Sequence, residues 1–245
     1  MRARIKTGVV GLDKMLYGGV PEGNQVIVAG GPGSGKTLLC FEFLYKNAKD
    51  GDVCLLFSLE EDTQSIIDNA KEAYAEFTDI DDLIKNKKLI ICGSDKTSRF
   101  VHRDIEGNAY TFGKMVSEIE ALILDSGAKR IVIDSVSVIK LFIKDLYEYR
   151  NISVGLISVL RNLKTTCLLT MEIEAAERSR LVFQPEFFIY DGIIMMYTTG
   201  GESESRAPTM EIIKMRGTGH SFSPVPYEIT PSGINLMLLA ERKEL

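Results

Sequence analysis

The sequence predicts an α/β fold: a mostly parallel, twisted sheet flanked by helices on both faces, with antiparallel strands at its C-terminal edge. Short apolar runs alternate with segments of helical spacing as far as Met171, an order typical of parallel sheets whose crossovers are helices. Beyond Met171 the apolar runs are short and are joined by glycine, proline and serine turns, which favours antiparallel strands. The 245 residues, 45% hydrophobic and 26% charged, fit one globular domain, residues 1–245.

The first two strand–helix units lie near the N-terminus. Residues 25–30 (QVIVAG) form an apolar run that leads through a glycine turn to apolar side chains at helical spacing in 37–49. Residues 53–59 form a second apolar run, and 63–77 place their apolar side chains on one helical face. Residues 89–92 are then expected to form a short third strand.

The next segment is polar. Residues 93–110 have no clear period and predict a long loop, which in a compact domain is usually functional or mobile. Helical spacing returns in 111–126, and 131–133 form a strand that ends in Asp134. A helix over 146–163 and a strand over 166–171 follow. The expected edge strands are 192–199, 209–217, 226–230 and 234–238, with a turn at 200–205.

Charge and composition exclude several classes of protein. The formal net charge of −5 gives no overall electrostatic reason to bind nucleic acid or an anionic membrane. No apolar run approaches the ~18 residues of a spanning helix, and the N-terminus lacks the apolar core of a secretory signal. We therefore expect a cytoplasmic protein with no membrane partner. The cysteines occur singly in apolar segments, which predicts buried reduced thiols rather than a zinc site or a disulfide framework: Cys40, Cys54, Cys92 and Cys167.

The turn after the first strand carries the Walker A pattern, Gly30-x-x-x-x-Gly35-Lys36-Thr37, between a strand and a helix as the pattern requires. Glycines let successive backbone N–H groups converge on phosphate oxygens, and the helix adds its free N-terminal donors. Lys36 is expected to reach the β- and γ-phosphates as a catalytic cation, and the Thr37 hydroxyl to hold Mg²⁺. The predicted nucleotide-binding residues are Gly30, Gly31, Pro32, Gly33, Ser34, Gly35, Lys36, Thr37 and Leu38.

Two strand ends supply carboxylates. Asp134 ends the strand RIVID and fits the Walker B role at the magnesium site, although an Asp in this place is often a helix cap. Glu60 and Glu61 follow the second strand, where a carboxylate would orient the attacking water or accept its proton. The alternative is a solvated acidic turn that caps the next helix. The sequence does not separate the two glutamates.

These motifs together resemble the KaiC-type branch of the RecA/RadA ATPases. The similar segments are TGVVGLDKMLYGGVPEGNQVIVAGGPGSGKT, the Glu60-Glu61 pair, IVIDSVS and KMRGTGHSFSPVPYEITPSGI. They extend from Lys6 to about Ile234, in the order of the family, and are most similar to the single-domain archaeal KaiC-like proteins. The clock members of the family carry two such domains in tandem and phosphorylate themselves. We expect a single domain here, and we therefore predict neither a circadian role nor autophosphorylation.

The resemblance implies a RecA-like P-loop core that assembles into a hexameric ring of identical subunits, with ATP and Mg²⁺ between neighbours. Lys214 and Arg216 would then reach the γ-phosphate held by the next subunit, and Thr218 and His220 would lie near its base and sugar. Without the resemblance, Lys214 and Arg216 alternate on a strand and equally well face solvent. The segments around Gly11–Asp13 and Gly18–Pro21 would have a structural role.

Three functions remain open. The first is Mg²⁺-dependent ATP hydrolysis at the subunit interfaces. The second is an ATP-responsive switch or scaffold with little turnover that acts on an unidentified protein partner, although the intact carboxylates favour the enzyme. The third is a recombinase-like, DNA-stimulated ATPase. Its DNA-binding loops would be 93–110, with Lys96, Arg99, His102 and Arg103, and 174–186, with Arg178 and Arg180; neither offers a strongly positive groove with aromatic platforms.

Overall fold

The structure, a computed structural model, describes residues 2–97, 112–143, 145–173, 185–198 and 208–238. Two short strands pair with each other at the N-terminus, β1 (Arg4–Ile5) and β2 (Val20–Pro21). The other described strands form one sheet: β3 (Gln25–Gly30), β4 (Cys54–Ser58), β5 (Leu89–Cys92), β6 (Arg130–Asp134), β7 (Thr166–Glu172), β8 (Gly192–Thr198), β9 (Pro208–Met215), β10 (Val225–Thr230) and β11 (Gly233–Leu236).

The order of this sheet is β11-β10-β9-β8-β3-β7-β6-β4-β5. The six strands from β8 to β5 are parallel, and the three strands on the other side of β8 are antiparallel. The predicted mixed sheet with an antiparallel C-terminal edge is therefore confirmed. Because β3 lies inside the parallel part, its carboxyl end meets those of β7 and β8 at one edge of the sheet.

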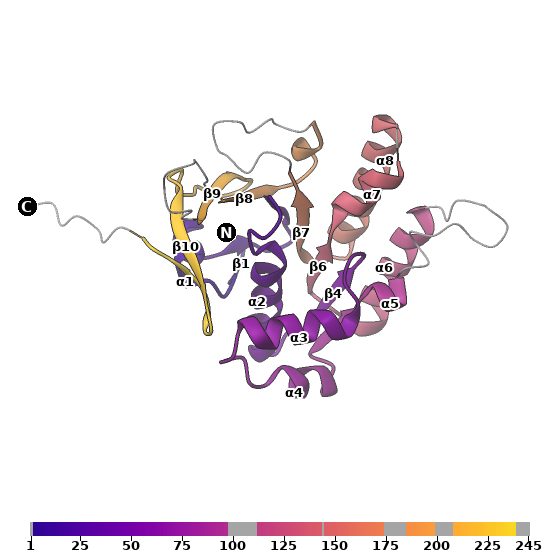
Figure 1. Cartoon of the computed structure of the whole chain (residues 1–245). Helices are drawn as coiled ribbons and strands as arrows, with labels where there is room; N and C mark the ends of the chain where they lie inside the picture. The colour runs from indigo at the N-terminus through magenta and orange to yellow at the C-terminus, as the bar shows by residue number, and fades with distance from the viewer. Residues whose placement is uncertain (1, 98–111, 144, 174–184, 199–207, 239–245) are drawn as a thin grey trace, which may run out of the picture.

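Helices cover both faces, as predicted (Figure 1). Side chains of β3 alternate between the two cores: Val26 and Val28 face one, and Ile27 and Ala29 face the other. The first core lies under α1 (Val10–Met15), α2 (Lys36–Lys49), α3 (Thr63–Ala73) and α4 (Ile80–Lys85); the second lies under α6 (Phe112–Ser126), α7 (Val136–Phe142) and α8 (Leu146–Asn162).

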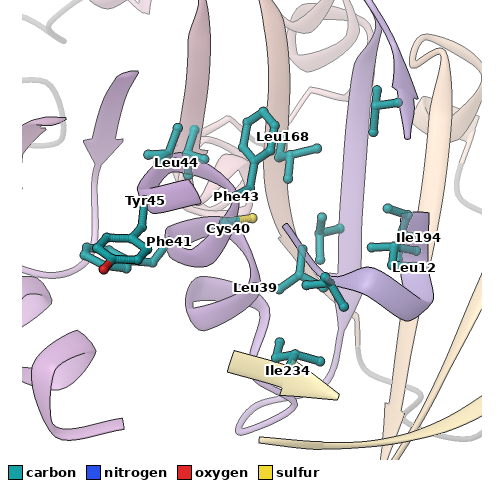
Figure 2. Packing of buried hydrophobic residues seen from close by; sticks show 14 of the residues in the cluster. Leu12, Leu39, Cys40, Phe41, Phe43, Leu44, Tyr45, Leu168, Ile194 and Ile234 are labelled. Atoms are coloured by element: carbon teal, nitrogen blue, oxygen red, sulfur yellow. The ribbon is translucent and has the colours of Figure 1, made fainter. Parts of the chain in front are cut away.

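The helix α2 occupies the centre of the first core. Figure 2 shows its Leu39 and Cys40 directed toward Leu168 of β7 and Ile194 of β8. Of the four cysteines Cys40, Cys54 and Cys167 are buried and Cys92 is partly exposed; all four are free thiols. Burial raises the pKa of the Cys40 and Cys167 thiols, which keeps them protonated. No helix in the described ranges has the length and apolar character needed to span a bilayer.

The helix expected over 63–77 is shorter in the structure. The side chain of Asp62 caps its start by accepting from the Ser65 N–H at 2.9 Å, and the backbone leaves the helix at Tyr74. Tyr74 and Phe77 are nevertheless buried, and the Phe77 ring stacks on Tyr45 with a centroid separation of 3.9 Å. Their apolar spacing therefore reflects packing against α2 rather than a continued helix.

Four short α-helices of the described ranges were not expected. They are α1, α4, α7, which Ser135 caps by accepting from the Ser137 N–H, and α5 (Ser94–Thr97), which lies within the predicted loop 93–110. The rest of that loop and the turn at 200–205 lie outside the described residues, as does most of the loop 174–186. The last two residues of the loop 174–186 begin a short 3-10 helix, η3 (Pro185–Phe188).

The β10–β11 hairpin is anchored to α2 through a buried carboxyl group. Glu42 of α2 is only 2% exposed, and its Oε2 accepts a hydrogen bond from the Ile234 N–H at 2.8 Å. Burial raises the pKa of Glu42 to about 7, because the Ile234 N–H and the nearby Lys46 compensate only part of the lost hydration. The charged form of Glu42 is therefore unfavourable in the folded chain.

This raised pKa predicts a pH-dependent stability. A carboxyl group whose pKa is higher in the folded than in the unfolded chain stabilises the fold below its unfolded pKa, and that contribution is lost as pH rises through about 7. Between pH 5 and 8 Glu42 should reduce the free energy of unfolding by about 2–3 kcal/mol. Glu42→Gln should remove this component, as measured by urea unfolding across the range.

The matched control is Glu76→Gln, which changes an exposed glutamate in the same way. Its unfolding free energy should follow that of the unmodified protein at every pH. Parallel pH profiles for the Glu42→Gln variant and the unmodified protein would contradict the assignment of this pH dependence to Glu42.

Candidate active site

The candidate site begins where β3 ends and α2 starts. Gly30 is the last residue of β3, and α2 begins at Lys36. A Cβ atom on Gly30 would lie 2.5 Å from the carbonyl oxygen of Met196 on β8, so the strand packing admits only glycine. Gly35 has φ +86°, a backbone conformation that favours glycine. These two residues fix a turn whose backbone N–H groups lie at the helix N-terminus, where anions bind.

Lys36 is the first residue of α2, directly after this turn. It is 8% exposed, and its Nζ donates to the carbonyl oxygen of Gly31 at 2.9 Å. Burial lowers its pKa, while the nearby carboxylates of Glu172, Asp134 and Glu60 raise it in part. The ammonium group is thus poorly hydrated and is held by a single carbonyl, an acceptor that a phosphate oxygen can replace.

Side-chain oxygen atoms from one helix, α2, and two strands, β6 and β7, meet beside Lys36. Asp134 Oδ2, at the end of β6, accepts from the Thr37 hydroxyl of α2 at 3.0 Å, and its Oδ1 accepts from the Thr170 hydroxyl of β7. Burial raises the pKa of Asp134, and the two hydroxyl groups lower it. Thr37 and Asp134, predicted from the sequence to hold Mg²⁺, therefore lie in direct contact.

This set of oxygen donors fits Mg²⁺. The ion prefers hard oxygen ligands and usually keeps several waters beside one or two carboxylates and the substrate phosphates. In the described part of the chain no group of three or more His, Cys, Asp or Glu side chains is arranged to hold a metal ion, so the protein would supply a small share of the ligands. Thr37 and Asp134 would hold the ion, and the phosphates and water would complete its coordination.

The structure separates the two glutamates that the sequence leaves together. Glu60 Oε1 accepts from the Ser135 hydroxyl at 2.7 Å, on the side of Asp134 and Lys36. Burial raises the pKa of Glu60, with further contributions from the negative charges of Asp134 and Glu172. Glu61 instead accepts from the Asn69 amide of α3 at 2.8 Å. Glu60 therefore lies with Lys36 and Asp134, whereas the Glu61 carboxylate is bonded to α3, from where its negative charge still contributes to the raised pKa of Asp134.

A cavity of about 390 Å³ adjoins the site between α2 and α3. It begins at Thr37, next to the glycine turn, and Glu61 and Asn69 lie on its α3 side. Its apolar lining comes from Leu38, Phe41, Ile66, Ala70 and Ala73. An apolar cleft with a few polar groups beside a phosphate-binding turn can take a flat heterocyclic base.

Lys214 and Arg216 lie on and just after β9, two strands from β3, and toward the amino ends of the parallel strands. Lys214 pairs with Ile193, which pairs with Ile27, whereas Gly30 pairs with Met196. At 3.3 Å per residue, Lys214 is displaced by about 10 Å along the strands from the end of β3, toward their amino ends. The sheet register thus keeps these two cations away from the glycine turn of their own chain.

Neither cation is a simple solvent-facing charge. Lys214 Nζ donates to the Tyr190 carbonyl at 2.6 Å, and burial lowers its pKa. The Arg216 guanidinium donates to the Phe188 carbonyl at 3.0 Å and lies 3.4 Å from the Asp191 carboxylate. Both side chains remain partly exposed, and the Phe188 residue beside them is 67% exposed. Together they form a small cationic and aromatic surface at the amino edge of the sheet.

Thr218 and His220 differ in their exposure. Thr218 is partly exposed, and its hydroxyl accepts from Arg4 at 2.7 Å. His220 is 7% exposed, and its ring lies against Phe222 with a centroid separation of 4.5 Å. Its Nδ1 is 3.0 Å from the Ser221 carbonyl oxygen. The His220 side chain is therefore part of the protomer's own packing.

Sequence reasoning missed two hydroxyl groups of the site. Thr170 and Ser135 contact Asp134 and Glu60, respectively. Each had a usable signal, because Thr170 is a polar residue near the carboxyl end of an apolar strand and Ser135 directly follows the strand-end Asp134. Polar residues at the carboxyl ends of parallel strands face the ligand site.

The fold and the site together define a P-loop nucleotide-binding protein of the RecA type. Comparison with known proteins identifies the family: the model of the KaiC ATPase family matches residues 5–241. The chain therefore belongs to the KaiC ATPase family.

Related proteins agree with this assignment. A UPF0273 protein of Methanocaldococcus jannaschii, MJ1359, is 32% identical over 237 residues, which cover 94% of this chain and 95% of the relative. The circadian clock oscillator protein KaiC of Picosynechococcus is also 32% identical, over 96% of this chain but only 45% of its own length. The crystal structure of the KaiC-like protein PH0186 of Pyrococcus horikoshii superposes with a TM-score of 0.80 at 28% identity, covering 97% of this chain and all of that one.

The tight packing at Gly30 gives a direct test of the site's geometry. Gly30→Ala should destabilise the protein by about 1–3 kcal/mol, because the added methyl group meets backbone atoms of β8. Gly155→Ala is the control. Gly155 is exposed in the middle of α8 with open space beside it, so alanine there should stabilise the protein by about 0.5–1 kcal/mol. Chemical unfolding measures both, and equal effects would contradict the packing described.

Proposed function

We propose that the chain is a Mg²⁺-dependent ATP hydrolase whose active site is completed by a neighbouring copy in a ring. The observation that carries this proposal is the position of Lys214 and Arg216 relative to the P-loop of the same chain: Lys214 lies about 10 Å from the end of β3 along the strands, and its ammonium group is bonded to the Tyr190 carbonyl. One chain cannot bring both to one nucleotide, whereas a head-to-tail arrangement of copies brings one edge of the sheet against the opposite edge of the next.

The chemistry follows from the side chains at the P-loop edge. The backbone N–H groups of residues 31–35 and Lys36 would bind the phosphates, and Thr37 and Asp134 would hold Mg²⁺, which neutralises the charge that develops on them. The adenine base would occupy the apolar cavity between α2 and α3. Leu38, which the sequence predicts to bind the nucleotide, lines that cavity and would contact the base.

Glu60 is the residue best placed to act on water. It lies on the side of Lys36 and Asp134, and burial raises its pKa toward the range where a general base is effective. The Ser135 hydroxyl, at 2.7 Å, fixes its orientation and favours the ionised form that accepts a proton. Glu61, bound to Asn69, would contribute to the wall of the base cavity instead.

The cations at the amino edge would complete the site of the next copy. Positive charge supplied by a neighbour stabilises the transferring phosphoryl group. Lys214 and Arg216 are held by carbonyl groups of residues 187–190 and remain partly exposed, so they are available at the surface in fixed positions. A homo-hexamer of single-domain copies is the arrangement that the family resemblance implies, with Thr218 better exposed than His220 for contact with the base and sugar.

The roles of the two glutamates can be separated by phosphate release from Mg-ATP. Glu60→Gln should lower the rate by about 100-fold or more while binding is retained, because the amide cannot accept the proton of water. Glu61→Gln should lower the rate of phosphate release by less than about 10-fold.

The same assay distinguishes the alternative functions. If the unmodified protein releases phosphate no faster than Glu60→Gln, the ATP-responsive switch is favoured. If single-stranded DNA strongly stimulates release, the recombinase-like ATPase is favoured.

Mixing two inactive variants tests the shared site. Lys36→Ala removes the P-loop cation and Arg216→Ala removes the neighbour's cation, so each variant alone should be inactive. In a ring assembled from equal amounts of the two variants, an interface is complete when one copy supplies Lys36 and its neighbour supplies Arg216. About one interface in four meets this condition, so about a quarter of the unmodified protein's activity should return. Size measurement with ATP verifies that mixed rings form. Mixed rings without activity, or an active Arg216→Ala variant, would contradict the proposal.

A further inference from the structure

We infer that Tyr227 is a positioning residue of the phosphate site: it holds the carbonyl of Ser34 and thereby turns the N–H of Gly35 toward the bound phosphates. This inference rests on the proposed function, because it concerns the same site. Tyr227 belongs to the β10–β11 hairpin, which is far from the P-loop in sequence and was not expected to contact it.

The contact between the hairpin and the loop is close and buried. The Tyr227 hydroxyl donates to the carbonyl oxygen of Ser34 at 2.5 Å, and both residues are 2% exposed. One residue further along the loop, a Cβ atom on Gly35 would lie 2.9 Å from Cδ1 of Ile229, which is two residues after Tyr227 on the same strand. The hairpin therefore contacts two consecutive loop residues.

The geometry of the peptide bond explains why this contact matters. The carbonyl of Ser34 and the N–H of Gly35 belong to one planar trans peptide unit, so they point in opposite directions. When the carbonyl is held by Tyr227, the N–H is directed away from the hairpin. Gly35 is the N-cap residue of α2, and the N–H groups at a helix N-terminus have no partner within the helix and bind anions.

The hairpin has other anchors that do not involve the Tyr227 hydroxyl. Glu42 of α2 accepts from the Ile234 N–H, and the Pro231 carbonyl accepts from the Glu76 N–H at 3.1 Å. These two bonds hold the turn of the hairpin against α2 and the segment after α3, and the turn itself is closed by the Thr230 hydroxyl, which donates to the Gly233 carbonyl at 2.7 Å. Removing the hydroxyl should therefore release the Ser34 carbonyl while the hairpin stays in place.

The test uses Tyr227→Phe in the full chain, with Tyr149→Phe as control. Tyr149 is equally buried, but it lies on α8 in the core on the other face of the sheet. The binding of Mg-ADP and of adenosine is titrated for each variant. Tyr227→Phe should weaken Mg-ADP binding by roughly 3- to 10-fold, since one hydrogen bond to the phosphates becomes poorly oriented. Adenosine, which has no phosphate, should bind all three proteins equally.

The outcomes separate this inference from the proposed function. If the unmodified protein does not bind Mg-ADP, the proposed function fails and the inference with it. If the unmodified protein binds Mg-ADP and Tyr227→Phe binds it equally well, the inference alone is overturned. Equal losses for Mg-ADP and adenosine, or unfolding of Tyr227→Phe while Tyr149→Phe stays folded, would show a general structural role for Tyr227 and would also overturn it.

Discussion

The contact between the Thr37 hydroxyl and the Asp134 carboxylate is the interaction on which the rest of the site depends. Thr37 follows β3, whereas Asp134 ends β6, and β7 lies between them in the sheet. Thr170 of β7 binds the other oxygen of the same carboxylate. The parallel register of three neighbouring strands therefore places a hydroxyl, a carboxylate and a second hydroxyl together, and a change in strand order would separate them.

The cost of burying Asp134 is offset only in part within this group. Burial and the charge of Glu61 disfavour its ionised form, and two hydroxyl donors together with the positive charge of Lys36 favour it, so its pKa stays above the usual value. Lys36 in turn is stabilised by the carboxylates of Glu172, Asp134 and Glu60. These charges are arranged around an opening at the end of the sheet, where a metal ion and phosphates can complete their neutralisation.

The sequence predicts the local parts of this arrangement better than the long-range parts. The P-loop and the strand-end Asp134 follow from patterns a few residues long, and the sheet from the alternation of apolar segments. The division between Glu60 and Glu61 depends on Ser135 and Asn69, which belong to two other elements. The burial of His220 and the end of α3 at Tyr74 also result from packing against residues distant in sequence, which no local period encodes.

The C-terminal strands connect the two edges of the sheet. β9 ends beside Lys214 and Arg216 at the amino edge, and β10 then returns to the carboxyl edge, where Tyr227 contacts the P-loop. If a neighbour's nucleotide binds beside Lys214 and Arg216, the segment from β9 to β10 would contact two nucleotides: the neighbour's at the end of β9 and its own chain's at Tyr227. Since β8, β9 and β10 are joined by backbone hydrogen bonds, the distance between the two sites would be set by the sheet, and each copy would act as a spacer of fixed length in the proposed ring.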